Sequence, residues 1–461
     1  MLRAFTVFLA LIAPLPVAPA FADTRVPTSQ AEIALGFAPL VKQAAPAVVN
    51  IYAKRVVQVS DSPFMGDPFF RDFFQERTRP KVQNSLGSGV ILTAGGIVVT
   101  NYHVVGQATD IRVVLNDRRE FSARLVMSDQ ESDLAVLQMQ DADGLPHLGM
   151  RDSDTVLVGE LVLAIGNPFG VGQTVTSGIV SGLARSGTAT GSSRGYFIQT
   201  DAPINPGNSG GALVDINGDL IGINTRILTR SGSSNGIGFA IPAALVAEFV
   251  DQAEAGFDRF VRPWAGMSGQ PVDNDLAESL GLAIPQGILI SQVHAVSPFN
   301  EAGFRAGDVI RAIDGYAVNT PEEMVFRMSV SGLGNRVNVQ RFRDGEIDEL
   351  PVRLMPAPED PARAAQTVPD AVALAGVTLV NVNPAVMAEF GLPLTVRGVV
   401  VSDPGPIGAR AGLRKGDVIM AIDGAKVATT SAALAALKDA RRSLSLEVQR
   451  GAQRVQMRFR F

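Results

Sequence analysis

Cysteine is absent from this chain of 461 residues, and histidine occurs only three times. Without cysteine there are no disulfide bonds and no thiol nucleophile, so stability must come from core packing. The histidines are scattered and no His-Glu-x-x-His pattern occurs, which argues against zinc catalysis. A Walker loop is also missing, so no nucleotide-driven motor is expected. The sequence therefore predicts no metal and no cofactor.

Charged residues are too evenly mixed to indicate a charged partner. The 40 basic and 45 acidic residues give a net charge of −5. Because no basic patch and no like-charge block occurs, we expect no nucleic-acid partner. Aromatic residues make up only 6%, whereas the chain has 46 glycines and 28 prolines. This composition is typical of turn-rich β structure rather than of long helices.

The N-terminal segment 1–22 has the pattern of a secretory signal peptide. Arg3 precedes an apolar run, and an Ala-x-Ala cleavage site ends at Ala22. Pro14 and Pro16 interrupt the run before the ~20 residues that a membrane span needs, so a retained anchor is the less favoured alternative. We expect an exported protein.

Short segments rich in valine and isoleucine follow one another over residues 30–256, separated by glycine, asparagine or aspartate. This pattern is typical of strands joined by tight turns, and Asn217-Gly218 predicts a hairpin with positive φ. Evenly spaced hairpins favour β-barrels or a sandwich over a sheet with crossover helices. The segment 241–256 is predicted to form a closing helix.

An internal repeat occupies the remainder of the chain. The segment 302–315 recurs at 411–424 with 11 of 14 residues identical, which predicts two copies of one module of roughly 90 residues. Residues 357–369, rich in proline and charge, are a plausible linker between the copies.

Three residues form a candidate catalytic set. His103 follows the strand-like GIVVT, Asp133 precedes the apolar LAVLQM, and Ser209 lies in GNSGG. The order His, Asp, Ser is that of the two-barrel serine proteases. A serine hydroxyl needs an imidazole to take its proton during attack, and a carboxylate to orient that imidazole. Each of the three residues, taken alone, also has a non-catalytic interpretation. Ser209 could belong to a turn, and Asp129 and Glu131 are alternative candidates for the carboxylate role of Asp133.

The glycines beside Ser209 support a nucleophile rather than a turn. Without Cβ atoms the backbone can approach a scissile carbonyl, so that N–H groups converge on the oxyanion. The predicted oxyanion hole comprises Gly207, Asn208 and Ser209, with the N–H groups of Gly207 and Ser209 as donors.

The sequence resembles the HtrA (Deg) family of exported serine proteases. The matching blocks are GSGVI, TNYHVV, SDLAVL, GNPFG, TDAPINPGNSGGAL and GIGFAIP, and Tyr102 is a departure from the usual asparagine. The resemblance implies a mostly β fold, with a chymotrypsin-like double β-barrel protease domain (30–256) followed by two PDZ (α+β) domains (262–356 and 370–461). It also implies His103 as general base, Asp133 as the residue that orients it, and Ser209 as nucleophile.

The same resemblance places a specificity pocket near Ile204 and the loop 224–238, where branched apolar walls would favour cleavage after small aliphatic residues. Plain core packing of Ile204 is the alternative. The substrate-binding residues predicted in this way are Ile204, Gly207, Ile227 and Ile237.

PDZ domains add the C-terminal segment of a ligand as an extra strand and hold its carboxylate on backbone N–H groups. Two loops are candidates for this role, and a role in assembly is the alternative for the second module. The predicted carboxylate-binding residues are Trp264, Ala265, Gly266 and Met267 in the first module, and Leu374, Ala375, Gly376 and Val377 in the second.

The sequence and the resemblance together predict a periplasmic, ATP-independent serine endopeptidase that degrades unfolded polypeptides and captures C-terminal peptides. Two alternatives are a peptide-binding chaperone or scaffold with an inactive protease-like domain, and a protease that cuts one regulatory substrate. Trimers or multiples of trimers are the family norm. Five phenylalanines within 64–74 indicate either a packed loop or a surface that faces a partner.

Overall fold

The computed structural model describes residues 36–58, 80–167, 172–187, 192–205, 207–227, 236–440 and 443–460. The predicted signal peptide, the phenylalanine-rich segment 64–74 and most of the loop 224–238 lie outside these residues. No helix within the described ranges is long and apolar enough to cross a membrane.

The first six strands close into a barrel around an aliphatic interior. The barrel is formed by β1 (Val48–Gln58), β2 (Pro80–Ile91), β3 (Ile97–Thr100), β4 (Asp110–Val114), β5 (Glu120–Asp129) and β6 (Leu134–Met139), in the order β1-β2-β3-β6-β5-β4. Ile51, Val98 and Leu137 are fully buried in its core. A single-turn helix, α4 (Tyr102–Val105), follows β3.

The next six strands close a second barrel. These strands are β7 (Leu161–Gly166), β8 (Thr174–Gly187), β9 (Ser192–Thr200), β10 (Ala212–Val214), β11 (Leu220–Ile227) and β12 (Gly238–Pro242), in the order β10-β11-β12-β9-β8-β7. The predicted hairpin joins β10 to β11, but only Gly218 has positive φ (89°), because Asp215 N–H bonds to Asp219 O across a turn longer than two residues. The double β-barrel expected from the sequence is confirmed.

The two barrels share a continuous core, which fixes their relative position. One buried cluster contains Val136 of the first barrel, Ile165 of the second, and Phe249 of α5 (Ala243–Glu254). The predicted closing helix is therefore confirmed. Phe249 also stacks on Phe260, with ring centroids 3.9 Å apart. The remaining helical turns in the described residues of this part are α2 (Ala38–Ala44), η1 (Ala45–Ala47) and η3 (Ser153–Thr155).

A third sheet follows the barrels. It contains β13 (Met267–Pro271), β14 (Ile288–Val293), β15 (Val309–Ile313), β16 (Tyr316–Ala317), β17 (Arg336–Arg343) and β18 (Glu346–Arg353), with α6 (Asn274–Leu280), α7 (Pro298–Glu301) and α8 (Pro321–Val330). The strand order is β13-β14-β15-β17-β18, with β16 beside β15.

A fourth sheet repeats this plan. It contains β19 (Gln366–Thr367), β20 (Thr378–Asn381), β21 (Val399–Asp403), β22 (Val418–Ile422), β23 (Ala425–Lys426), β24 (Ser443–Arg450) and β25 (Gln453–Arg460), with α9 (Pro384–Phe390), α10 (Gly405–Arg410) and α11 (Thr430–Asp439). Here the order is β19-β20-β21-β22-β24-β25. Part of the expected linker 357–369 thus enters this sheet as β19.

The internal repeat has a structural reason. Asp308 and Asp417 occupy equivalent positions in the two copies, and each is only 1% exposed. Each buried carboxylate forms an ion pair with an arginine of a later strand, Arg343 in β17 and Arg450 in β24. A buried carboxylate without such a partner would be strongly destabilising, so both members of the pair are needed in both copies.

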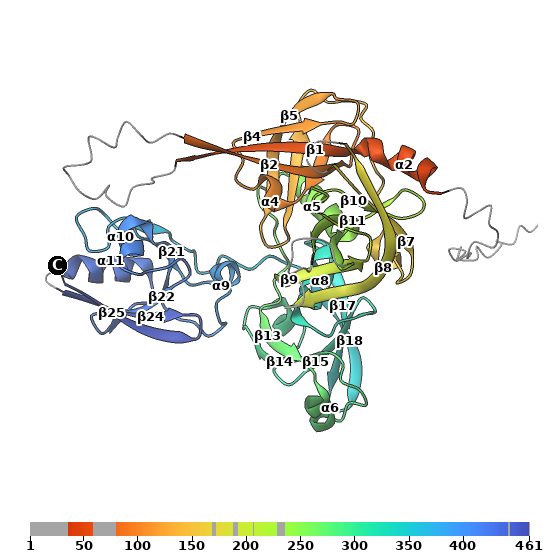
Figure 1. Ribbon diagram of the computed structural model, residues 1–461. Coiled ribbons are helices and arrows are strands. Elements are labelled where there is room, and N and C mark those ends of the chain that lie inside the picture. The colour runs from red at the N-terminus through yellow and green to blue at the C-terminus, as the bar shows by residue number, and fades with distance from the viewer. Residues whose placement is uncertain are drawn as a thin grey trace, which may run out of the picture.

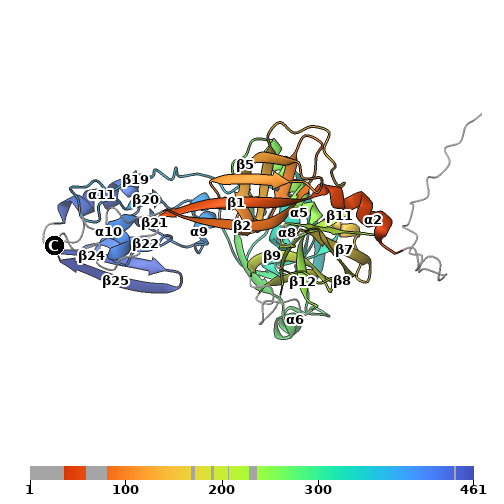
Figure 2. The same ribbon diagram turned by 45° about the horizontal axis from the view of Figure 1, so that its top comes forward.

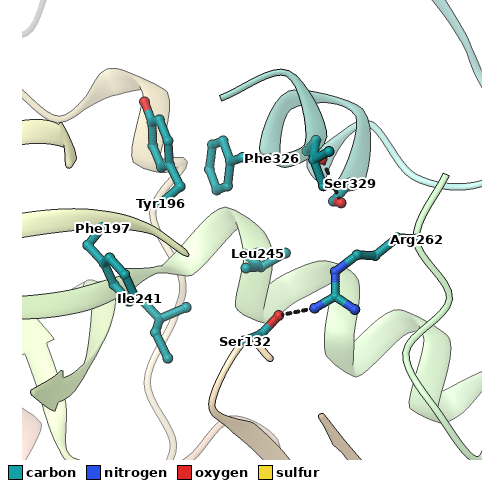
Figure 3. A pocket seen from close by; sticks show the side chains of 9 residues that line it. Ser132, Tyr196, Phe197, Ile241, Leu245, Arg262, Phe326 and Ser329 are labelled. Atoms are coloured by element: carbon teal, nitrogen blue, oxygen red, sulfur yellow. Dashed lines mark hydrogen bonds between the residues drawn. The ribbon is translucent and has the colours of Figure 1, made fainter. Parts of the chain in front are cut away.

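The third sheet docks on the second barrel through α8, whereas the fourth lies at the side of the molecule (Figures 1 and 2). Phe326 of α8 stacks on Tyr196 of β9, with ring centroids 3.8 Å apart. Arg327 forms an ion pair with Asp154 of η3. Figure 3 shows a crevice beside this contact, where Arg262 donates a hydrogen bond to Ser132. No residue of the predicted triad lines this crevice.

Candidate active site

Strand pairing in the first barrel brings His103 and Asp133 together. β3 and β6 are antiparallel with Thr100 opposite Ala135, so the end of β3 meets the start of β6. Asp133 has a φ of 55°, and His103 Nδ1 lies 2.9 Å from both carboxylate oxygens of Asp133. The backbone N–H of His103 also donates to Asp133 Oδ1, at 3.1 Å. The carboxylate therefore holds both the ring and the backbone of His103.

The carboxyl group of Asp133 is buried but remains ionised near neutral pH. Burial, with only 5% of Asp133 exposed, would raise its pKa. The hydrogen bond and charge of His103, together with the hydroxyl of Thr225, outweigh burial and hold the pKa of Asp133 below its usual value. Because the folded pKa lies below the unfolded pKa of about 3.9, the stabilising contribution is complete above that pH and is lost as the pH falls through the folded pKa.

Ser209 lies in a loop of the second barrel that only glycine permits. Gly210 has a φ of +81°, and a Cβ atom there would lie 2.2 Å from Ser88 O. The loop is closed by bonds from Asn208 N–H to Asn205 O (3.0 Å) and from Gly210 N–H to Asn224 O (2.8 Å). A side chain at position 210 would thus separate the Ser209 loop from the first barrel.

The hydroxyl of Ser209 donates to Thr225 O, at 3.0 Å. Within the described part of the chain no hydrogen bond joins this hydroxyl to His103. Thr225 also donates its own hydroxyl to Asp133 Oδ2, at 2.6 Å. Thr225 therefore contacts both Ser209 and Asp133 of the predicted triad. The Ser209 hydroxyl must break its hydrogen bond to Thr225 O before it can reach the imidazole of His103.

Ser88 of β2 connects the first barrel to the loop that carries Ser209. Its N–H donates to Ser209 O at 3.0 Å, and its hydroxyl donates to Gly207 O at 2.6 Å. The same hydroxyl accepts from Asn167 N–H at 2.8 Å. Ser88 is 0% exposed, so water cannot replace these bonds.

Two of the three predicted oxyanion-hole residues keep an N–H group that has no acceptor among the described residues. Asn208 N–H is engaged by Asn205 O, and its side chain is buried, with 1% exposed. Among the described residues, the N–H groups of Gly207 and Ser209 donate to no protein group. The carbonyl groups of these two residues are both held by Ser88, which limits rotation of the loop. Gly207 has a φ of 103°, a backbone conformation that favours glycine.

The predicted specificity residues do not form one described pocket. Ile204 is 1% exposed and belongs to the core of the second barrel. A Cβ atom on Gly238 would approach its Cδ1 to 2.8 Å. Ile237 packs against the core shared by the barrels, and the side chain of Ile227 lies outside the described residues. The specificity pocket remains a prediction.

The two predicted carboxylate loops differ in which N–H group is engaged; in the first, Trp264 N–H donates to Met355 O at 2.8 Å. In the first, Gly266 has a φ of +60°, and Ala265 O accepts from Ser297 Oγ at 2.6 Å. In the second, Gly376 N–H already donates to Val368 O at 2.9 Å. One of the groups expected to bind a ligand carboxylate is thus engaged within the chain.

Three residues of the site escaped sequence reasoning, namely Thr225, Ser88 and Asn101. Asn101, which is fully buried, donates its side-chain amide to Asp133 O at 2.9 Å. Ser88 stands between two glycines, and Thr225 follows Asn224 after the apolar strand residues LIGI. A polar residue inside an otherwise apolar or glycine-rich segment was the available signal, but it does not identify the partner.

Three family models match the chain. Residues 87–223 match a trypsin-like peptidase domain, and residues 263–354 and 398–450 each match a PDZ domain.

Curated relatives match over most of their length. A probable periplasmic serine endoprotease, DegP-like, of Marinomonas sp. (strain MWYL1) is 39% identical over 414 residues, which is 86% of each chain. The periplasmic pH-dependent serine endoprotease DegQ of Escherichia coli (strain K12) is 38% identical, over 90% of this chain and 89% of the relative. Among solved structures, the HtrA-type protease AlgW with decapeptide is 40% identical with a TM-score of 0.53, over 70% of this chain and 99% of that chain.

We predict that Thr225→Val impairs turnover although valine has nearly the same shape as threonine. The loss of the hydroxyl removes a bond to an ionised carboxylate, which contributes about 1.5–3 kcal/mol. A tenfold to hundredfold lower kcat/KM is therefore expected, with a raised pKa of Asp133. Steady-state kinetics on an unfolded polypeptide test this. Thr225→Ser, which keeps the hydroxyl, should restore most activity, and full activity of the valine variant would contradict the prediction.

We predict that Ser88→Ala lowers kcat more than it changes KM. The variant leaves Gly207 O and Asn167 N–H without their buried partner, at a cost of about 1–3 kcal/mol. Because the predicted oxyanion donors would act in the transition state, this cost should appear mainly in kcat. Ser85→Ala on the same strand is the matched control. An unchanged kcat in Ser88→Ala, or an equal loss in the control, would refute the role of Ser88.

Proposed function

The chain belongs to the HtrA family of DegP-like periplasmic serine endoproteases, with a trypsin-like domain and two PDZ domains, and from this premise we propose that His103, Asp133 and Ser209 form its catalytic triad. The observation that supports this proposal most directly is the contact between His103 and Asp133, in which Nδ1 lies 2.9 Å from both carboxylate oxygens. A proton on Nδ1 leaves the other ring nitrogen, Nε2, free to act as the base.

The proposed reaction begins when the Ser209 hydroxyl turns from Thr225 O towards His103. Nε2 takes the hydroxyl proton as Oγ attacks the substrate carbonyl, and the N–H groups of Gly207 and Ser209 bind the oxyanion. The imidazolium then gives this proton to the leaving amine, and an acyl-enzyme remains. A water molecule, deprotonated by the same nitrogen, releases the acid and regenerates Ser209.

Unfolded exported polypeptides are the proposed substrates. A scissile peptide must be extended to place its carbonyl between two backbone donors, and folded proteins present few such segments. The side chain of His103 is 49% exposed, which leaves the base accessible to a chain approaching from solvent. The expected removal of segment 1–22 belongs to the same proposal, because the relatives are named periplasmic.

The first PDZ module is proposed to capture substrate C-termini. β13 pairs with β14 alone among the described strands, so its other edge is available for an added strand. Helix α8 packs beside β13 and would form the second wall of the groove. The loop from Trp264 to Met267 stands at the start of this edge, where a terminal carboxylate would lie.

Replacement of the nucleophile tests the catalytic proposal. Ser209→Ala should lower turnover of an unfolded polypeptide roughly 10⁴- to 10⁶-fold, because no other group can form the acyl-enzyme. Ser279→Ala, on the exposed helix α6, is the matched control and should retain activity. Equal degradation by Ser209→Ala and the unmodified chain would refute the assignment. Suppression of aggregation by Ser209→Ala would reveal a separate holding activity.

Cleavage preference tests the proposed specificity pocket. The apolar side chains of Ile204 and Ile237 offer no partner to a charged residue, so cleavage after valine, alanine or isoleucine is expected. Mass spectrometry of the products of an unfolded polypeptide measures this preference. A dominant preference for lysine or arginine would show that an acidic group shapes the pocket.

A further inference from the structure

The two PDZ modules differ at the strand edge that receives a ligand. β13 of the first module and β20 of the second both follow their carboxylate loops, and both are flanked by a helix, α8 and α11. β13 is the outermost strand of its sheet, whereas β20 is covered by β19. Among the described residues, β19 has no counterpart in the first module.

The covering strand is bound as an extended ligand would be bound. Gln366 and Thr367 pair in antiparallel register with Leu379 and Thr378. At the end of this pairing, Val368 N–H donates to Val377 O at 2.8 Å and Val368 O accepts from Gly376 N–H at 2.9 Å. The carbonyl of Val368 thus stands at the predicted carboxylate loop, where the terminal carboxylate of a captured peptide would be held.

The side chain of Val368 occupies the apolar end of the same groove. Val368 is 1% exposed and belongs to one buried cluster with Val377, Leu379 and Leu437 of α11. Burial of a valine side chain contributes about 1.5–3 kcal/mol. The neighbouring Thr367 is exposed, so burial is confined to the position that a terminal ligand residue would take.

Helix α11 forms the other wall of this groove. The hydroxyl of Thr430 donates to Ala364 O at 3.0 Å, and the Gln366 side chain donates to Ser431 Oγ at 3.4 Å. The segment is therefore bonded to the helix on one side and to β20 on the other.

Further bonds extend the contact upstream. Asn381 N–H donates to Arg363 O at 2.7 Å, and the Asn381 side chain donates to Ala362 O at 2.9 Å. Arg363 also pairs with Glu389 of α9 at 3.0 Å. The segment 362–368 is thus held along its whole length.

We propose that residues 362–368 are an internal ligand that fills the peptide groove of the second PDZ module, with Val368 in the position of a ligand's C-terminal residue. The comparison with the first module rests on the function proposed above, namely that the first module captures peptides; the internal ligand itself does not depend on it. The second groove is a peptide site for an extended segment ending in a β-branched apolar residue, and its occupant is this chain itself.

An occupant in the same chain competes strongly with free peptides. A tethered ligand acts at an effective concentration on the order of 1 mM. A free peptide of equal intrinsic affinity would then bind with an apparent Kd no lower than that concentration, because it must displace the tethered copy. Each chain is therefore expected to have one open peptide site, which is the groove of the first module.

A cross-link tests whether the segment lies in the groove. Thr367 Oγ1 and Thr378 Oγ1 are 3.0 Å apart on directly opposed residues, a pairing that suits a disulfide. Because the chain has no cysteine, the variant Thr367→Cys/Thr378→Cys should cross-link almost completely under mild oxidation. The pair Thr367→Cys/Thr395→Cys, with the second residue outside the groove, should remain reduced. Failure of the first pair to cross-link would overturn the proposal.

Peptide binding tests whether the occupied groove is closed to other ligands. The probe is the labelled peptide ARAAQTV with a free carboxylate, titrated into the full chain carrying Ser209→Ala to prevent cleavage. Oxidation of the cross-linkable pair in this background should leave one peptide bound per chain with unchanged Kd. A loss of binding on cross-linking would show that free peptide enters the second groove, and would overturn the proposal.

Ejection of the internal ligand should open a second site. Val368→Asp places a charge where the groove is apolar, so a folded variant, judged by its circular dichroism, should bind two peptides per chain. A folded variant that still binds one would count against the proposal. If the variant does not fold, the cross-linked comparison decides. Absence of peptide binding in every form would refute capture by the first module, while the cross-link would still test the internal ligand.

Discussion

The bond between the Thr225 hydroxyl and Asp133 joins a strand of the second barrel to the buried carboxylate of the first. A hydrogen bond to a charged group contributes about 1.5–3 kcal/mol, so this bond and the contact with His103 keep the buried carboxyl group of Asp133 ionised. Ser88 makes the complementary connection from the first barrel to the loop that carries Ser209. Together they fix the alignment of the barrels on which the geometry of the proposed triad depends.

The sequence predicted the features that a short segment can specify. The order of His103, Asp133 and Ser209 and the glycines of the nucleophile loop suggested the two-barrel architecture. It did not predict Thr225 or Ser88, because their roles depend on partners in the other barrel. Nor did it predict β19, since proline and charge in 357–369 are typical of a linker. Gln366 and Thr367 become a strand because β20 supplies the hydrogen-bond partners, not because of their own propensity.

The two PDZ modules show how one repeated core can present two different binding edges. The repeat preserves the buried pairs Asp308–Arg343 and Asp417–Arg450, which lie within the sheets. The strands β13 and β20 are not constrained by these ion pairs. The residues beside their outer edges come from the part of the chain that precedes each module. In the second module that neighbour pairs with β20; in the first, the preceding residues lead from α5, which packs in the core shared by the barrels. A shared fold with the same buried ion pair therefore allows the two modules to differ in ligand binding.

The resting position of the Ser209 hydroxyl is compatible with proteolysis on energetic grounds. Its bond to Thr225 O must break before attack, and a hydrogen bond of this kind contributes a net of about 0.5–1.5 kcal/mol. Such a cost slows turnover by roughly tenfold at most, since 1.36 kcal/mol corresponds to a factor of ten. Loss of a triad member costs on the order of 10⁴-fold or more. Rotation of one hydroxyl is thus a small barrier beside the chemistry, and Thr225 can hold both ends of the proposed triad without preventing its action.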